Sequence, residues 1–154
     1  MSIEEIYNYL KVNDELVLSG QPREEQLQAT AEEGFTTVIN LATISPRYSL
    51  KDEAGLVQAL GMRYYHIPVE WEHPTPADFE AFEKIFKGLS TQKTLVHCAA
   101  NFRVTAFYSL YGIKNLGWSE QQAADFRSVI WKGTDNPVWE KFIAYMKTSF
   151  RRDE

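Results

Sequence analysis

Short apolar runs alternate along this chain with segments of helical length, and Gly or Pro marks most of the junctions. The runs expected as strands are 16–18, 36–41, 64–69 and 95–98. Helices are expected at 2–10, 22–33, 51–60, 77–89, from the 98–103 loop to about 116, and at 119–132 and 137–150. Because strands separated by helices of this length pair in parallel through right-handed crossovers, the pattern predicts an α/β protein. Its sheet should be open, mainly parallel and four- to five-stranded, with helices on its faces.

The amino-acid composition further restricts the class of protein. The 154 residues are 44% hydrophobic and 14% aromatic, which fits one globular domain over 1–154. A net charge of −5 excludes a general nucleic-acid binder. The N-terminus is acidic and no apolar run approaches the roughly 20 residues that span a bilayer, so we expect a soluble, cytoplasmic protein without a membrane partner. The oligomeric state is left open.

Cysteine and histidine usage limits the chemistry. The single cysteine, Cys98, excludes an intramolecular disulfide and a multi-cysteine zinc site. The three histidines show no metal-ligand spacing, so we predict no metal and no cofactor. In open parallel sheets ligands bind beyond the C-terminal ends of the strands. The loops 42–50, 70–76 and 98–103 leave those ends, and a site is expected to be assembled from them.

The strand at 95–98 ends at Cys98, and an arginine, Arg103, follows in the first turn of the next helix. Such a junction aims backbone N–H groups and a helix N-terminus at one point, which makes an anion site. The same field favours the thiolate form of Cys98, and Arg103 can offer a planar fork to two oxygens of a tetrahedral anion. These groups together predict nucleophilic attack on a phosphoryl group. The expected phosphate-binding residues are Ala99, Ala100, Asn101, Phe102 and Arg103. The alternative is that Cys98 is only a buried core residue.

His97-Cys98 with a following arginine resembles the signature of cysteine-based protein tyrosine and dual-specificity phosphatases. Segments 18–22, 34–41 and 65–69 resemble the small bacterial branch of that superfamily, which is related to the phosphatase-like domain of β-lactamase-hydrolase-like proteins. The resemblance implies phosphomonoester hydrolysis with Cys98 as the nucleophile of a phosphocysteine intermediate and Arg103 as the phosphate clamp. It also implies that Thr105 takes the place of the hydroxyl residue after the arginine. His97 is expected to orient the loop through hydrogen bonds.

One feature departs from that family. It places five residues between cysteine and arginine, whereas this chain has four, and its usual mid-loop glycine is Asn101 here. Asn tolerates the left-handed conformation. One helical position corresponds to about 100° and 1.5 Å, a shift that can slow turnover on the order of 100-fold.

The short loop keeps two alternatives open. One is a catalytically inactive phosphate-binding pseudophosphatase. The other is a rhodanese-like sulfurtransferase with a persulfide on Cys98, because sulfurtransferases of that type often carry a shorter loop. The substrate also stays open between protein, lipid, nucleotide and sugar phosphates.

The general acid of the family is usually an aspartate on a separate loop, and this chain has none between Glu53 and Ala77. Glu72, or Glu70, is the candidate that replaces it when the loop closes over the site. A merely solvated acidic loop is the alternative. Asp78 is expected to complete a capping box with Thr75 instead.

The 42–50 loop is expected to form the rim of the site. Arg47 could bind a second anionic group there and Tyr48 could stack on a substrate ring. His66 is expected to be a hydrogen-bonded core residue. Six aromatic residues near the C-terminus fall at helical spacings and are expected to be core: Trp118, Phe126, Trp131, Trp139, Phe142 and Tyr145.

Overall fold

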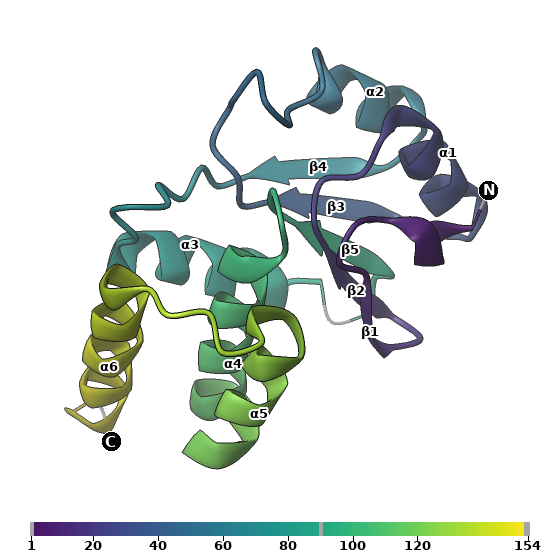
Figure 1. The fold of residues 1–154 in the computed structure, drawn as a ribbon. Helices are drawn as coiled ribbons and strands as arrows, with labels where there is room; N and C mark the ends of the chain where they lie inside the picture. The colour runs from purple at the N-terminus through teal and green to yellow at the C-terminus, as the bar shows by residue number, and fades with distance from the viewer. Residues whose placement is uncertain (1, 90, 153–154) are drawn as a thin grey trace.

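The protein is a five-stranded sheet flanked by helices, seen in a computed structural model that describes residues 2–89 and 91–152. The strands lie in the order β1-β2-β5-β3-β4, and only β1 is antiparallel to its neighbour (Figure 1). This confirms the predicted open, mainly parallel α/β sheet. The strand bounds are β1 Leu10–Asn13, β2 Leu16–Ser19, β3 Thr37–Asn40, β4 Arg63–His66 and β5 Thr94–His97.

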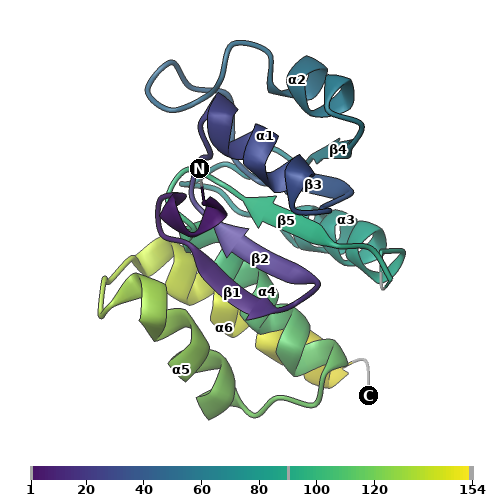
Figure 2. The same cartoon turned by 90° about the vertical axis from the view of Figure 1, so that its right-hand side faces the viewer.

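Helices cover both faces of this sheet. Two of them, α1 and α2, lie on one face, and α3 to α6 lie on the other (Figures 1 and 2). Their bounds are α1 Glu24–Glu32, α2 Glu53–Ala59, α3 Pro76–Lys87, α4 Phe102–Asn115, α5 Glu120–Trp131 and α6 Pro137–Arg152. Within the described residues, no helix combines the length and the apolar character that a bilayer crossing requires.

The central strand is β5, and it fixes where a site can form. It pairs in parallel with β2 and β3, so that Val96 lies beside Leu18 and Ile39. All four β5 residues are buried, because helices cover the strand from both sides. The chain leaves the sheet after His97, at the middle of its C-terminal edge. Cys98 therefore follows the most enclosed strand of the fold.

The N-terminal prediction is wrong. A helix was expected over 2–10, but only a short 3-10 helix, η1 (Ile3–Glu5), forms. Asn8 has a left-handed φ of 51°, which a continuing right-handed helix does not allow. Residues 10–13 pair with the open edge of β2 instead, and the backbone obtains its hydrogen bonds there. Helix α1 also begins at Glu24 rather than Pro22, because Arg23 occupies the N-cap.

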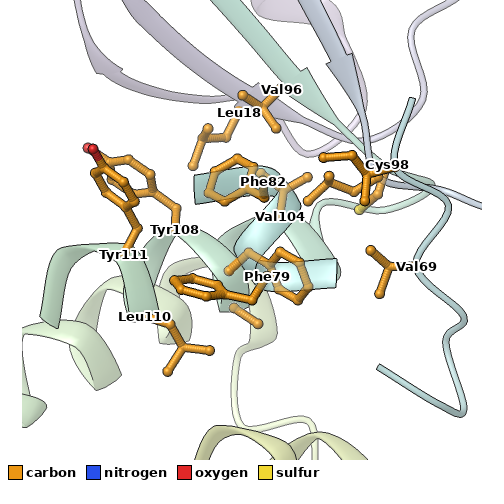
Figure 3. Packing of buried hydrophobic residues seen from close by; sticks show 14 of the residues in the cluster. Leu18, Val69, Phe79, Phe82, Val96, Cys98, Val104, Tyr108, Leu110 and Tyr111 are labelled. Atoms are coloured by element: carbon orange, nitrogen blue, oxygen red, sulfur yellow. The ribbon is translucent and has the colours of Figure 1, made fainter. Parts of the chain in front are cut away.

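The larger hydrophobic cluster lies between the sheet and α3 to α6. Figure 3 shows Cys98 and Val69 at one end of it and Tyr111 at the other. Trp131, Trp139 and Phe142 are buried, and Trp118 and Phe126 pack against the same cluster, as predicted. The prediction for Tyr145 is wrong, because it is 56% exposed on the outer face of α6.

Gly112 tests how tightly α4 is packed. A methyl group there would overlap the indole ring of Trp118, which is itself wedged against Tyr108 and Phe126. We expect Gly112→Ala to lower the free energy of unfolding by about 1–3 kcal/mol in urea titrations, because overpacking outweighs the gain in helix propensity. Gly88→Ala is the matched control, since Gly88 has a helical φ of −72° and the new methyl would make no contact closer than 3.4 Å. Equal stability of the two variants would contradict this packing.

Candidate functional site

Cys98 lies at the floor of a small pocket where β5 runs into α4. The pocket has a volume of about 160 Å³ and is lined by Trp71, Cys98, Ala99, Ala100, Phe102 and Arg103. The Cys98 side chain is only 1% exposed, so the residue is nearly enclosed by the loop and the main hydrophobic cluster. The structure thus brings Cys98 and Arg103 to one cavity.

The carbonyl groups of this loop all bond to the surrounding structure. The Ala99 oxygen accepts from the Gln21 N–H (3.0 Å) and the Ala100 oxygen from the Asn8 amide (2.9 Å). Three further carbonyl oxygens have partners. The Cys98 oxygen lies 3.1 Å from His97 Nδ1, and the Asn101 oxygen accepts from Thr105 Oγ1 at 2.7 Å. The Phe102 oxygen accepts from Trp131 Nε1 at 3.2 Å.

That pattern sets the direction of the loop N–H groups. In a trans peptide each N–H points away from the preceding carbonyl, and no cis peptide occurs in the described chain. The N–H groups of Ala99 and Ala100 accordingly face away from the carbonyl partners, and neither has a protein acceptor among the described residues. The first N–H groups of α4 are also without intrahelical partners. Unpartnered N–H groups gathered in one loop are the kind of feature from which anion sites are built.

Asn101 closes the short loop. It is the N-cap of α4 with φ 70° and ψ 4°, the left-handed conformation that the sequence allowed for. Its buried side chain donates from Nδ2 to the Asn8 carbonyl oxygen (2.8 Å), while Asn8 donates back to Ala100. This reciprocal pair ties the loop to the N-terminal segment and holds a turn that most residues would strain.

Arg103 is buried, with 5% of its surface exposed, and it lines the pocket. Its Nη1 donates to the Val69 carbonyl oxygen at 2.9 Å, and its guanidinium carbon lies 6.0 Å from the centre of the Trp71 ring. Within the described residues no carboxylate forms an ion pair with Arg103. A buried guanidinium without an anionic partner favours an anionic ligand.

Thr105 supports the loop rather than the thiol. Its hydroxyl donates to the Asn101 carbonyl oxygen (2.7 Å) and accepts from Trp131 Nε1 (3.1 Å). The hydroxyl proton is therefore committed to the backbone at the start of α4. The indole N–H of Trp131, on α5, donates to the Thr105 hydroxyl and so stabilises this arrangement.

His97 is connected to a buried carboxylate. Its Nε2 lies 2.7 Å from Oε2 of Glu53, the first residue of α2, and both side chains are buried. Oε1 of Glu53 accepts from the Gln21 amide at 2.7 Å. Burial would raise the pKa of Glu53, but His97, Gln21 and Tyr64 outweigh it and hold that pKa below its usual value. Burial and the Glu53 carboxylate in turn raise the pKa of Tyr64.

The 70–76 loop presents Trp71 to the pocket, not its carboxylates. The Trp71 ring packs against Phe102, Trp131 and Trp139, with centroids 5.6–6.1 Å apart. Trp139 Nε1 also donates to the Trp71 carbonyl oxygen at 2.7 Å. Glu70 and Glu72 are exposed, and Glu72 lines a separate hollow beside α6. Neither glutamate is among the residues that line the Cys98 pocket.

The 42–50 loop does not line the pocket either. Arg47 is exposed, and the hydroxyl of Tyr48 donates to the Thr43 carbonyl oxygen of its own loop (2.9 Å). Asp78 and Thr75 form the predicted capping box at the start of α3. His66 is half-buried, with Nε2 2.6 Å from the Ala42 oxygen.

Three parts of the site escape sequence reasoning. Glu53 reads as an ordinary acidic residue in the first turn of a helix, and Asn8 falls inside a segment expected to be helical. Trp71 lies between Glu70 and Glu72, and a lone tryptophan in a loop carries no pattern that predicts a place in the pocket. A polar residue predicted to be buried, such as His97, requires a buried partner, and that requirement was the one available signal for Glu53.

Comparison with known proteins finds relatives of the same architecture. No protein-family model matches the chain. The crystal structure of a DUF442 protein from Shewanella putrefaciens CN-32, named "putative phosphatase", is 31% identical, covers 96% of both chains and has a TM-score of 0.85. The catalytic domain of the PP-IP phosphatase SIW14 from S. cerevisiae shares the fold with a TM-score of 0.75, at 15% identity over 96% of this chain and 93% of that one.

A beta-lactamase hydrolase-like protein of Xylella fastidiosa is 29% identical over 102 residues. The match covers 64% of this chain but only 23% of that protein. The chain therefore corresponds to a minor part of that relative's length.

The Glu53–His97 pair predicts a pH-dependent stability. Because folding holds the Glu53 pKa below its unfolded value, its contribution is present in full above about pH 4.5 and is lost as the pH falls further. We expect Glu53→Gln to lower the free energy of unfolding by about 1–3 kcal/mol at pH 7, with the difference from wild type shrinking at pH 4 and below. Urea titrations across this range measure it. A difference that stays constant with pH would contradict the charged pair.

Proposed function

Because the chain belongs to the DUF442 family and has the fold of cysteine-based phosphatases, we propose that its 98–103 loop binds a phosphate group and that Cys98 hydrolyses phosphomonoesters. The observation that carries this proposal is the loop itself. The carbonyls of Cys98 and Ala99 bond to the scaffold, so the opposing N–H groups of Ala99 and Ala100 are left for a ligand beside the thiol.

The chemistry proceeds in two displacements. The Cys98 thiolate attacks phosphorus, the bond to the ester oxygen breaks, and that oxygen leaves as an anion that takes its proton from water. Water then attacks the phosphocysteine and releases inorganic phosphate and the free thiol. Arg103 holds two phosphoryl oxygens with the donors it does not give to Val69, and the loop N–H groups stabilise the charge of the transition state.

Substrates with weakly basic leaving groups suit this site best. The pocket residues other than Cys98 and Arg103 are Trp71, Ala99, Ala100 and Phe102, so none of these can donate a proton to the leaving oxygen from its side chain. Glu72, the candidate acid, would have to move with the 70–76 loop and release Trp71 from Trp139. The proposed activity is therefore slow and depends on aryl or similarly activated phosphates.

A sulfurtransferase is the second candidate, and the four-residue spacing between Cys98 and Arg103 favours it. In that reaction the Cys98 thiolate attacks the outer sulfur of thiosulfate. Sulfite leaves, and Cys98 carries a persulfide. An acceptor thiolate then removes the sulfur. A pocket of about 160 Å³ with mostly apolar walls has room for the added sulfur atom, and Arg103 lies in the same pocket as a counter-charge to the persulfide.

Anion binding is the first test. We expect vanadate or phosphate to bind the wild type, and Arg103→Ala to weaken binding at least tenfold because a charge-assisted bidentate contact is lost. Isothermal titration calorimetry measures both. Arg63→Ala is the control, because Arg63 is exposed on β4 and outside the pocket. Equal affinity of wild type and Arg103→Ala would show that the loop is not the anion site.

Turnover separates the candidate functions. We expect slow release of p-nitrophenol from p-nitrophenyl phosphate and its complete loss in Cys98→Ser, since a serine hydroxyl is not ionised at neutral pH. Glu72→Gln should change this rate less than twofold. Phosphate binding with no Cys98-dependent turnover would identify a binding protein. A gain of one sulfur atom on Cys98 after thiosulfate treatment, seen by intact mass spectrometry, would favour the sulfurtransferase instead.

A further inference from the structure

A second cavity lies on the helical side of the molecule, between α5 and α6. Both helices pack on α4, and they diverge from each other on either side of it (Figure 1). The resulting cleft has a volume of about 360 Å³ and includes Arg127, Trp131, Asn136, Trp139, Ala144 and Lys147 in its walls. It shares no lining residue with the Cys98 pocket.

Arg127 supplies the charge of this cleft. It is half-buried on α5, and its Nη1 donates to Ser109 Oγ of α4 at 2.9 Å. No carboxylate in the described part of the chain forms an ion pair with it. Burial also lowers the pKa of Arg127, which is the cost of removing a guanidinium from water without an anion beside it.

The other charged groups of the cleft are arranged differently. Lys147 is bound to Glu120 at 2.9 Å, so its charge is already paired. Asp135 and Glu140 also line the cleft, but both are exposed, so water screens their repulsion of an anion. The unpaired cation is therefore more buried than the two acids of the cleft.

The inner wall of the cleft is aromatic. Trp131 and Trp139 are 8% and 1% exposed, with ring centroids 6.3 Å apart. Both indole N–H groups are committed, Trp131 to Phe102 and Thr105 and Trp139 to the Trp71 oxygen. Trp131 consequently offers apolar surface rather than a donor, with the nearly fully buried Trp139 beside it, and a flat apolar group suits this wall.

The geometry points to a ligand site in the α5–α6 cleft for a small aromatic carboxylate, with its anion on Arg127 and its ring against the exposed part of Trp131. The cleft is a binding site additional to the Cys98 loop and does not depend on the activity proposed there. A carboxylate would supply the acceptors that Arg127 lacks, and a planar ring would fill the remaining space without requiring donors from the tryptophans.

The probe for this site is 2-naphthoate, titrated by calorimetry and by the indole N–H resonances in NMR spectra. We expect saturable binding that shifts the resonances of Trp131 and Trp139 but not that of Trp118, which does not line the cleft. Arg127→Met should weaken binding at least tenfold, because the charged contact is removed while the aliphatic stem is kept. Arg63→Met is the matched control and should bind like wild type.

A second variant, Ala144→Phe, tests the same site in case Arg127→Met destabilises the fold. Ala144 is exposed on α6 and lines the cleft, so Ala144→Phe fills it while Arg127 stays in place. We expect this variant to keep the wild-type melting temperature and to lose naphthoate binding. Arg103→Ala should bind naphthoate normally, which distinguishes the cleft from the Cys98 loop. Binding that survives both cleft variants, or is lost only in Arg103→Ala, would overturn the proposal, as would no binding to wild type.

Discussion

The 98–103 loop and the pocket around it depend on the hydrogen bonds that hold the carbonyl oxygens of residues 98–102. Their donors come from separate parts of the chain: the N-terminal segment, the turn after β2, His97, and helices α4 and α5. Because each carbonyl is fixed from outside, the opposing N–H groups are directed before any ligand arrives, so binding requires little reorganisation.

The aromatic residues connect this loop to the helices behind it. The Trp71 ring lies against Phe102, Trp131 and Trp139. Phe102 and Trp131 are themselves stacked, with centroids 4.9 Å apart. Moving the 70–76 loop would break these contacts together with the Trp139 hydrogen bond. The position of the loop is thus set mainly by packing in the larger hydrophobic cluster, and only secondarily by the charges on its surface.

The sequence predicted the fold well where signals were local. Buried parallel strands, the capping box at Thr75 and the placement of Cys98 and Arg103 all follow from short patterns. It failed where the decisive partner is distant. The open edge of β2 determines that residues 10–13 form a strand, and no pattern within 2–10 reports that edge. Glu53 and His97 are 44 positions apart, so their pairing requires the folded chain.

We propose that the Ala99 and Ala100 N–H groups receive a tetrahedral anion beside Cys98. Phosphate titration of a ¹⁵N-labelled sample measures those two amide resonances directly. We expect both to move downfield with one shared saturation curve, and Arg103→Ala to require at least tenfold more phosphate for the same shift. Resonances of Ala99 and Ala100 that stay unchanged in the wild type at saturating phosphate would contradict it.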